Sequence, residues 1–318
     1  MILIDWDRTA RLAPGIVLVF GTGLIGGAAV RAIVSRIGTA RKRHFEWNWA
    51  ELAAPEATAL VAATEALLTA RPDARLTVIW AAGRSGFGSD DPAMELELRA
   101  FRRVLATVRR IAAAVPEERR AFIHVSSAGG LFEGQTACGP FAVPSPLRPY
   151  GTGKLAQEDL VLEDAGLGRR HILRPSSVYG YAPGARRGLI AALIAAAVRG
   201  RPATIMGSLT TQRDYVYAID IGRFIAARTF DETPPGAATE IALLASARPT
   251  AIFEVIQLIE AHQDARLLLR IDPRPENARD NTFLPNSLPS DFTPTRLSEG
   301  IALTAAAMTH DRFMGAML

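Results

Sequence analysis

The chain has 318 residues, of which 49% are hydrophobic and 21% are charged, and its formal net charge is +4. This composition is typical of a soluble globular protein and excludes disordered and collagen-like chains. No apolar run approaches the ~18 residues that a membrane-spanning helix needs, so we expect no membrane association. Arginines are interleaved with aspartates and glutamates, and the absence of a basic stripe argues against nucleic-acid binding.

The cellular location and the presence of a metal site can be judged from the cysteines, the histidines and the N-terminal residues. The single cysteine, Cys138, excludes an internal disulfide framework and fits a reducing cytoplasm. The five histidines lack the spacing of metal ligands, so we expect no metal site. The first residues place acids within an apolar patch and lack a preceding basic region, which is not the pattern of a secretory signal. We therefore expect a cytoplasmic protein.

Apolar runs and glycines predict alternating strands and helices over the first 175 residues. After a leader over residues 1–15, strands are expected over Ile16–Phe20, His44–Trp49, Leu76–Ala82, Ala121–Val125 and His171–Leu173. Helices are expected over Leu24–Ile37, Pro55–Ala70, Met94–Val115 and Tyr150–Glu163. This alternation predicts an α/β fold with a parallel, doubly wound sheet.

Regularity weakens after about residue 175, and prolines become more frequent. We therefore expect residues 1–174 to form the core domain, with residues 211–232 returning to it. Residues 175–318 are expected to form mainly a smaller lobe.

A glycine-rich turn follows the first buried strand. Gly21-Thr-Gly23-Leu24-Ile25-Gly26 has the spacing G-x-G-x-x-G and precedes a predicted helix. Glycines there permit a tight turn and let the backbone approach a pyrophosphate, while the amides at the start of the helix face its charge. The turn therefore indicates dinucleotide binding, the alternative being a βα turn that binds nothing.

The residue that would contact the adenosine ribose is not settled by the sequence. Glu46 lies about 20 residues after the glycines, as such an acid does, but inside the predicted strand rather than at its end. The cluster Arg41-Lys42-Arg43 would suit a 2′-phosphate, although it precedes the predicted strand and a solvated helix-end cluster is the favoured explanation. NAD and NADP both remain open.

A tyrosine and a lysine share one helix face. Tyr150 and Lys154 are four residues apart on the predicted helix, so their side chains are neighbours. A cation in that place lowers the pKa of a phenol, which can then exchange a proton with a substrate oxygen. Lys154 is one of only two lysines in a chain whose other basic residues are arginines. The pair therefore indicates acid/base chemistry rather than a surface lysine beside a packing tyrosine.

Two serines end the predicted strand before that helix. Ser126 and Ser127 lie at the carboxyl end of a parallel strand, where side chains face the ligand crevice. Ser127 is expected to hydrogen-bond the same substrate oxygen as Tyr150, the alternative being a turn or a helix cap.

Together these motifs resemble the extended short-chain dehydrogenases/reductases, the NAD-dependent epimerase/dehydratase family that acts mostly on nucleotide sugars. The resemblance covers nearly the whole chain and follows the family's order. Besides the glycine turn and the Ser127 and Tyr150 segments, it includes Ala81–Gly83, Leu173–Gly180, Arg213–Asp220, Arg274–Asn277 and Phe292–Ile301.

The resemblance implies a Rossmann-type core with a C-terminal substrate-binding lobe, an NAD(P) cofactor and, by analogy, a homodimer through helices such as 94–115 and 150–163. It implies Tyr150 as the acid/base, Lys154 as ligand of the nicotinamide ribose, and Ser127 as the group that polarises the substrate oxygen. The cofactor residues that it implies are Gly21, Gly23, Leu24, Ile25, Gly26, Ala81, Ala82, Gly83, Tyr150, Lys154, Pro175, Ser177 and Val178.

Two arginines match family positions that often hold the diphosphate of the substrate. Arg213 and Arg274 suit this role, since a guanidinium can bind phosphate oxygens in a bidentate manner. The alternative for each is a salt bridge, to Asp214 or to Glu276 respectively.

Departures from the family pattern limit which of the family's reactions we expect. Ala128-Gly129 follow Ser127 where the dehydratases have an Asp-Glu pair, so we expect no water elimination. Members that epimerise at carbons beside a ketone use a cysteine next to the serine and a histidine in the substrate lobe. Here Ala128 stands in the place of the cysteine, and no histidine occurs between His171 and His262. Glu97 stands roughly where an asparagine is usual.

The expected function is NAD(P)-dependent redox chemistry at one carbon, C4, of a nucleotide sugar. The stretch from Gly26 to Ala81 is shorter than in many 4-epimerases, which slightly favours a ketoreductase over a 4-epimerase. Reduction of a non-sugar carbonyl compound and a non-catalytic dinucleotide-binding regulator are the alternatives.

Overall fold

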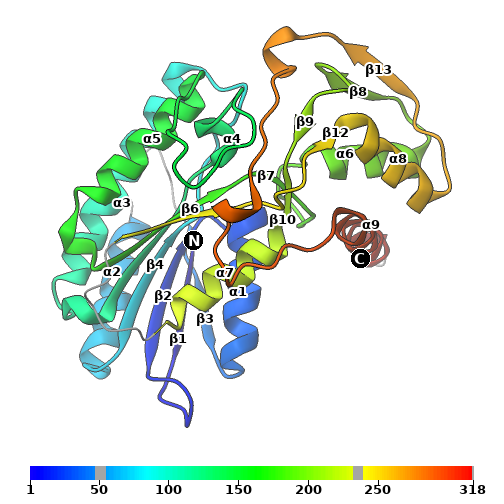
Figure 1. Ribbon diagram of the computed structural model, residues 1–318. Coiled ribbons are helices and arrows are strands. Elements are labelled where there is room, and N and C mark those ends of the chain that lie inside the picture. The colour runs from blue at the N-terminus through cyan, green and yellow to red at the C-terminus, as the bar shows by residue number, and fades with distance from the viewer. Residues whose placement is uncertain (47–54, 232–238, 317–318) are drawn as a thin grey trace. The chain divides into compact units, whose positions relative to one another are not determined.

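The structure is a computed structural model that describes residues 1–46, 55–231 and 239–316 (Figure 1). The chain groups into two compact units. The first unit contains Met1–Leu131, Pro146–Arg174 and Gly222–Ala242. The second contains Phe132–Ser145, Pro175–Ile221 and Leu243–Leu318.

A seven-stranded sheet of order β11-β6-β5-β4-β2-β1-β3 confirms the expected fold class (Figure 1). Its strands are β1 (Ile2–Trp6), β2 (Gly15–Phe20), β3 (Arg41–His44), β4 (Arg75–Trp80), β5 (Arg120–Val125), β6 (Arg169–Pro175) and β11 (Glu240–Leu244). β2, β4, β5 and β6 pair in parallel, and every residue of β2 is buried, as expected of central strands with helices on both faces.

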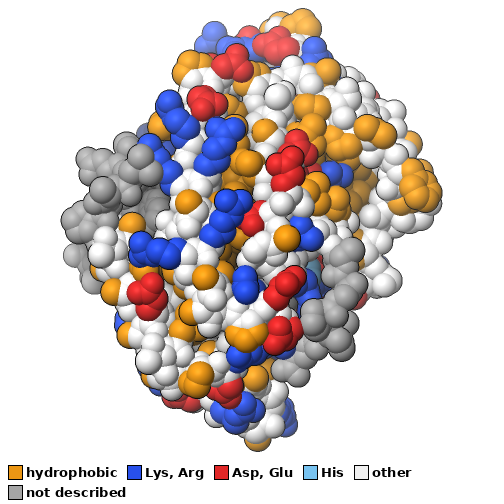
Figure 2. All heavy atoms as spheres, turned by 90° about the vertical axis from the view of Figure 1, so that its left-hand side faces the viewer, with side chains coloured by type: hydrophobic (Ala, Val, Ile, Leu, Met, Phe, Trp, Pro, Cys, Tyr) orange, Lys and Arg blue, Asp and Glu red, His pale blue; other side chains and the backbone are white. Residues whose placement is uncertain are grey.

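Helices cover the two faces of this sheet (Figure 1). One face carries α1 (Leu24–Ile37) and α7 (Ala218–Thr229), and the other carries α2 (Pro55–Ala70), α3 (Asp91–Ala112) and α5 (Pro149–Leu162). On the α3 side, Trp80 and Phe101 pack with ring centroids 4.8 Å apart, and both are fully buried. Figure 2 shows the outer side of the face with α2, α3 and α5, where basic, acidic and hydrophobic side chains are mixed.

The N-terminal segment expected as a leader contains a strand of the sheet, so that expectation was wrong. All five residues of β1 are buried, because β1 lies between β2 and β3 and pairs antiparallel with both. β2 and β3 are therefore parallel to each other, and α1 carries the chain from one to the other past β1.

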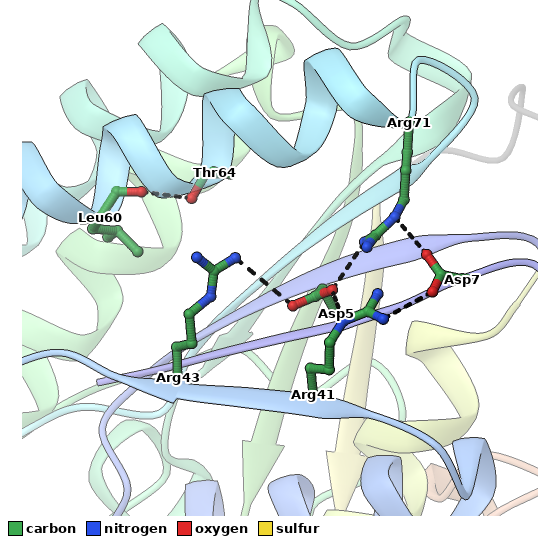
Figure 3. Close-up of polar contacts among 7 residues, drawn as sticks. All are labelled: Asp5, Asp7, Arg41, Arg43, Leu60, Thr64 and Arg71. Carbon is green, nitrogen blue, oxygen red and sulfur yellow. Dashed lines mark hydrogen bonds and ion pairs between the residues drawn. The ribbon is translucent and has the colours of Figure 1, made fainter.

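Charged side chains hold this inserted strand in place (Figure 3). Asp5 is 1% exposed and accepts hydrogen bonds from Arg41 at 2.8 Å and from Arg71 at 2.9 Å. Arg43 lies 3.8 Å from the same carboxylate, and Asp7 pairs with both Arg41 and Arg71. A carboxylate buried in a sheet needs such partners, because an unpaired buried charge is strongly destabilising.

Two expectations around this edge were wrong. The second predicted strand, His44–Trp49, is observed at Arg41–His44, and residues 47–49 lie outside the described part of the chain. Arg41, Lys42 and Arg43 form that strand instead of preceding it. Glu46 follows β3, and because β1 lies between β3 and β2, β3 is two strand spacings of ~4.8 Å from β2 instead of one. Glu46 is therefore farther from the glycine turn than an acid on a strand next to β2 would be.

The second unit has its own apolar core, with α6 and α8 packed on each other and on α9. Its helices are α6 (Leu189–Arg199), α8 (Ile252–Gln263) and α9 (Leu297–Ala316), and its strands are β7 (Ser177–Tyr179), β8 (Ala203–Met206), β9 (Gln212–Arg213), β10 (Tyr215–Tyr217), β12 (Thr250–Ala251) and β13 (Leu269–Asp272). Helix α4 (Ala128–Leu131) and single 3₁₀ turns at Glu117–Arg119, Ala165–Leu167, Pro275–Asn277 and Pro285–Ser287 complete the described elements. Within the described residues, none of the helices has the length and apolar character to span a bilayer.

Candidate active site

The glycine turn joins β2 to α1 and leaves room for a ligand. Gly21 has φ +86°, a conformation that favours glycine, and a Cβ there would lie 2.5 Å from the carbonyl oxygen of Ala81. A Cβ on Gly26 would overlap the carbonyl oxygen of Gly21. At Gly23, in contrast, no protein atom lies within 4 Å of the position that a Cβ would take. Gly21 and Gly26 thus shape the turn, whereas Gly23 leaves open space.

A cavity of about 490 Å³ borders this turn. Gly21 and Gly23 form one part of its wall, and the loop after β4 and helix α3 form the rest. The lining residues are Gly21, Gly23, Trp80, Ala81, Ala82, Gly83, Arg84, Ser85, Ser89, Ala93, Leu96, Glu97 and Ala100. The first turn of α1 carries no acid, and Gly23 caps it without a side chain, so its amides can receive a phosphate. The residues present therefore fit a dinucleotide. Leu24 and Ile25 begin α1 at this point.

Helix α5 carries Tyr150 and Lys154 and packs closely on α4 and α3. A Cβ on Gly151 would overlap the carbonyl oxygen of Gly130 in α4, and one on Gly153 would lie 2.5 Å from Cε of Met94 in α3. The glycines of the Tyr-Gly-Thr-Gly-Lys segment are thus explained by close helix packing. The Tyr150 ring lies beside the Phe87 ring, with centroids 5.7 Å apart. Lys154 Nζ lies 5.9 Å from the centroid of the Tyr150 ring.

Ser127 and Tyr150 meet at Gly130. The Oγ of Ser127 accepts a hydrogen bond from the amide of Gly130 at 3.2 Å. A Cβ on Gly130 would lie 3.0 Å from two carbons of the Tyr150 ring. Ser127 therefore caps the short helix α4, which was the alternative interpretation of this serine. Ser127 and Tyr150 thus both adjoin Gly130. Its hydroxyl retains a proton to donate.

Lys154 is 4% exposed, and it is held by two side chains that the sequence did not identify as functional. Its Nζ donates to Glu97 at 3.0 Å and to Gln157 at 3.1 Å, and Gln157 also donates to Glu97 at 3.1 Å. Burial is the largest single influence on the pKa of Lys154 and lowers it, but Glu97, Tyr150 and Glu158 together outweigh burial and raise this pKa above its usual value. Burial is also the largest single influence on the pKa of Glu97 and raises it, but Lys154 and the hydrogen bonds from Ser85 and Gln157 together lower this pKa.

Partial signals for these partners are present in the sequence. Gln157 lies one helical turn after Lys154, a spacing that makes side chains neighbours. Glu97 stood out only as a departure from the usual asparagine, because it is 57 residues away from Lys154 in sequence.

The remaining predicted site residues belong to the second unit. Ser177 and Val178 lie on β7, which pairs in parallel with β10, and Pro175 ends β6. Arg213 on β9 donates to the carbonyl of Asn277 at 3.2 Å, and Asn277 ends the 3₁₀ turn that follows Arg274. The two arginine segments are thus neighbours.

Arg274 and Asp214, which belong to the two arginine segments, each contact further polar groups of the second unit. Arg274 pairs with Asp272 at 3.0 Å. Asp214 accepts hydrogen bonds from Ser176 at 2.7 Å and from the amide of Ser246 at 2.7 Å, and burial raises its pKa. Asp214 therefore ties two segments of the second unit together.

Comparisons with known proteins identify the family and the fold of this chain. The family model described as "NAD dependent epimerase/dehydratase family" matches residues 17–241. A structure of MoeE5 in complex with UDP-glucose and NAD has a TM-score of 0.75 and 22% identity, covering 93% of this chain and 99% of that one. A UDP-glucose 4-epimerase from Thermotoga maritima with UDP-glucose has a TM-score of 0.71 and 18% identity, covering 93% and 99%. A UDP-glucuronic acid 4-epimerase from Bacillus cereus with UDP-glucuronic acid and NAD has a TM-score of 0.69 and 20% identity, covering 92% and 99%.

The family match confirms the resemblance carried by the sequence motifs. It also confirms the expected enzyme class and the NAD(P) cofactor. The similar structures confirm the fold.

Proposed function

Because the chain belongs to the NAD dependent epimerase/dehydratase family, we propose that it catalyses hydride transfer at one carbon, C4, of a nucleotide sugar. The observation that carries this proposal is the pairing of Tyr150 with the buried ammonium of Lys154, next to Ser127. A phenol beside a fixed cation can exchange a proton with a substrate oxygen, which is what an alcohol–ketone interconversion requires.

Each residue has a defined task in this proposal. Tyr150 donates a proton to the substrate oxygen on reduction and removes it on oxidation. Ser127 hydrogen-bonds the same oxygen and orients it. Lys154 stabilises the ionised phenol by its charge. When bound, NAD(P) supplies or takes up the hydride.

The division of labour between the units is also proposed. The first unit would hold the dinucleotide at the glycine turn, and the second would hold the nucleotide sugar. Arg213 and Arg274 would bind its diphosphate, a role supported by the proximity of their segments and by the bidentate geometry of guanidinium groups. The UDP-sugars bound by the similar structures support a nucleotide-sugar substrate.

Two net reactions use the same residues. Reduction of a 4-ketone is favoured by the short stretch between Gly26 and Ala81. Epimerisation at C4 is supported by the 4-epimerases among the similar structures. One experiment separates them: the purified protein is incubated with UDP-hexoses and with UDP-4-keto sugars, with and without added NAD(P)H. Turnover of the hexose without net change in cofactor indicates an epimerase, and stoichiometric NAD(P)H consumption with the ketone indicates a reductase. Failure of both reactions contradicts the proposal.

The arginines test the substrate class. Arg213→Ala and Arg274→Ala should each raise the KM for the nucleotide sugar by about tenfold or more, since loss of a charge-assisted hydrogen bond costs about 1.5–3 kcal/mol. If the double variant keeps full activity on nucleotide sugars, the diphosphate role is wrong, and activity on non-sugar ketones becomes the alternative. We further propose that the protein is cytoplasmic and that it forms a homodimer. Light scattering, which measures the molar mass, checks the dimer.

A further inference from the structure

The ammonium of Lys154 sits in a place where a lone charge would be unstable. Its side chain is 6% exposed and that of Glu97 is 7% exposed, and their polar atoms are 3.0 Å apart. Gln157 is fully buried and bonds both groups. The pair joins α3 to α5 below the cavity, and Glu97 lines the cavity wall. A buried ion pair of this kind needs all of its hydrogen bonds, because removing one partner leaves the other charge uncompensated.

Glu97 also reaches the loop after β4. Its Oε2 accepts a hydrogen bond from the amide of Ser85 at 3.0 Å, while Oε1 accepts from Lys154 and Gln157. A Cβ on Gly83 would lie 3.1 Å from the carboxylate and 3.4 Å from Lys154 Nζ, so the backbone of this loop packs directly on the ion pair. An asparagine or glutamine in this position would offer similar hydrogen bonds but no charge.

The other groups that face Lys154 do not replace that charge. His124 on β5 is fully buried, and burial together with Lys154 lowers its pKa well below the usual value, so it is neutral. Tyr150 and Glu158 on α5 also act on Lys154 through their charges. Glu158, however, accepts three hydrogen bonds from Arg174. Glu97 is the carboxylate in direct contact with the ammonium.

We propose that Glu97 is a positioning residue that keeps Lys154 charged and fixed beside Tyr150. The catalytic meaning of this role rests on the proposed function, whereas the electrostatic role holds without any substrate. In its absence, the effect of burial on Lys154 would be opposed mainly by the more distant charges of Tyr150 and Glu158, and the pKa of the lysine would fall.

The lysine content of the chain allows a direct test. Lys42 and Lys154 are its only lysines, so protein labelled with ¹³C at the lysine Cε gives two resonances, which the Lys42→Arg variant assigns. Lys42 is exposed and serves as an internal control. In the wild type, the titration midpoint of the Lys154 resonance should lie above the usual value for a lysine. In Glu97→Gln, its midpoint should fall by about two units or more.

Matched variants make the result decisive. Glu95→Gln removes a carboxylate two residues away on α3, with a side chain 53% exposed, and should leave the Lys154 midpoint unchanged. Glu97→Asp keeps the charge at a longer distance and should give a midpoint between those of the wild type and Glu97→Gln. This variant also serves if Glu97→Gln does not fold. The proposal is overturned if the Lys154 midpoint is unchanged in folded Glu97→Gln. If Glu97→Gln does not fold, an unchanged midpoint in Glu97→Asp overturns it.

Activity supplies a second readout. In Glu97→Gln, turnover should fall as the pH rises through the lowered Lys154 midpoint, and Glu97→Asp should recover part of the alkaline activity. A merely structural role would lower turnover equally at all pH values. If the wild type shows no turnover, the proposed function fails, but the resonance titration still decides the role of Glu97.

Discussion

Asp5 on β1 and Arg71, which directly follows α2, are joined by a hydrogen bond of 2.9 Å. This contact ties the inserted strand to the connection that leads from α2 into β4. Because Arg41 on β3 binds the same carboxylate, one buried charge links three segments at the edge of the sheet.

We therefore expect Asp5→Ala to destabilise the protein by about 3–5 kcal/mol, the usual cost of removing one partner from a buried ion pair. Urea unfolding followed by circular dichroism measures the change. The matched control is Asp73→Ala, which removes the exposed pair with Arg8 and should leave the unfolding midpoint unchanged. Equal effects of the two substitutions would show that Asp5 does not anchor the strand.

The glycine turn offers a pair of variants that separates folding from binding. Gly21→Ala places a Cβ against the backbone at φ +86° and should lower the melting temperature. Gly23→Ala meets no protein atom within 4 Å and should leave the melting temperature unchanged, yet fill the space that a pyrophosphate needs. We expect it to raise the Kd for NAD(P)H tenfold or more, as measured by fluorescence titration. Unaltered NAD(P)H affinity in Gly23→Ala would place the dinucleotide elsewhere.

Two glycines of α5 should also respond differently. Gly151→Ala collides with the backbone of Gly130, so α5 must move and Tyr150 with it. Gly153→Ala meets the flexible Met94, and the helix propensity of alanine offsets part of the strain. We expect Gly151→Ala to cost about 1–3 kcal/mol and to lower kcat strongly, and Gly153→Ala to have smaller effects on both. The reverse order of kcat values would contradict the packing described.

Stability at low pH should depend on Glu240. Burial opposes its charge, but hydrogen bonds from His171 and Arg228 lower its pKa from 4.5 to about 2. A carboxylate with a lowered folded-state pKa stabilises the protein above pH 4.5, and this contribution is lost as the pH falls towards 2. The unfolding free energy of Glu240→Gln should therefore lie below that of the wild type at pH 6, with the difference shrinking by pH 3. A difference that is constant with pH would exclude this linkage.

Several elements followed from sequence patterns because their causes are local. β2, α1, α3 and α5 were predicted to within a few residues by apolar periodicity and by Pro and Gly signals. β1 was missed because its burial depends on pairing with two distant strands, and an acid at position 5 hid its apolar character. The Arg71 contact that makes this acid tolerable is 66 residues away.

In the candidate active site, too, some features follow from local sequence patterns and others depend on distant contacts. The neighbouring positions of Tyr150 and Lys154 follow from helix geometry. The ion pair of Lys154 with Glu97 depends on how α3 packs on α5, which local patterns do not encode. The roles of the second-unit residues Pro175, Ser177, Val178, Arg213 and Arg274 stay predictions.

The most direct test of the account is turnover by Tyr150→Phe, measured together with its affinity for NAD(P)H. Loss of the phenol oxygen removes the proton donor and leaves the ring in its packing against Gly130 and Phe87. We predict that kcat on the nucleotide sugar falls by about 10²–10⁴ while the Kd for NAD(P)H changes little. Turnover equal to that of the wild type would contradict the assignment of Tyr150 as the acid/base.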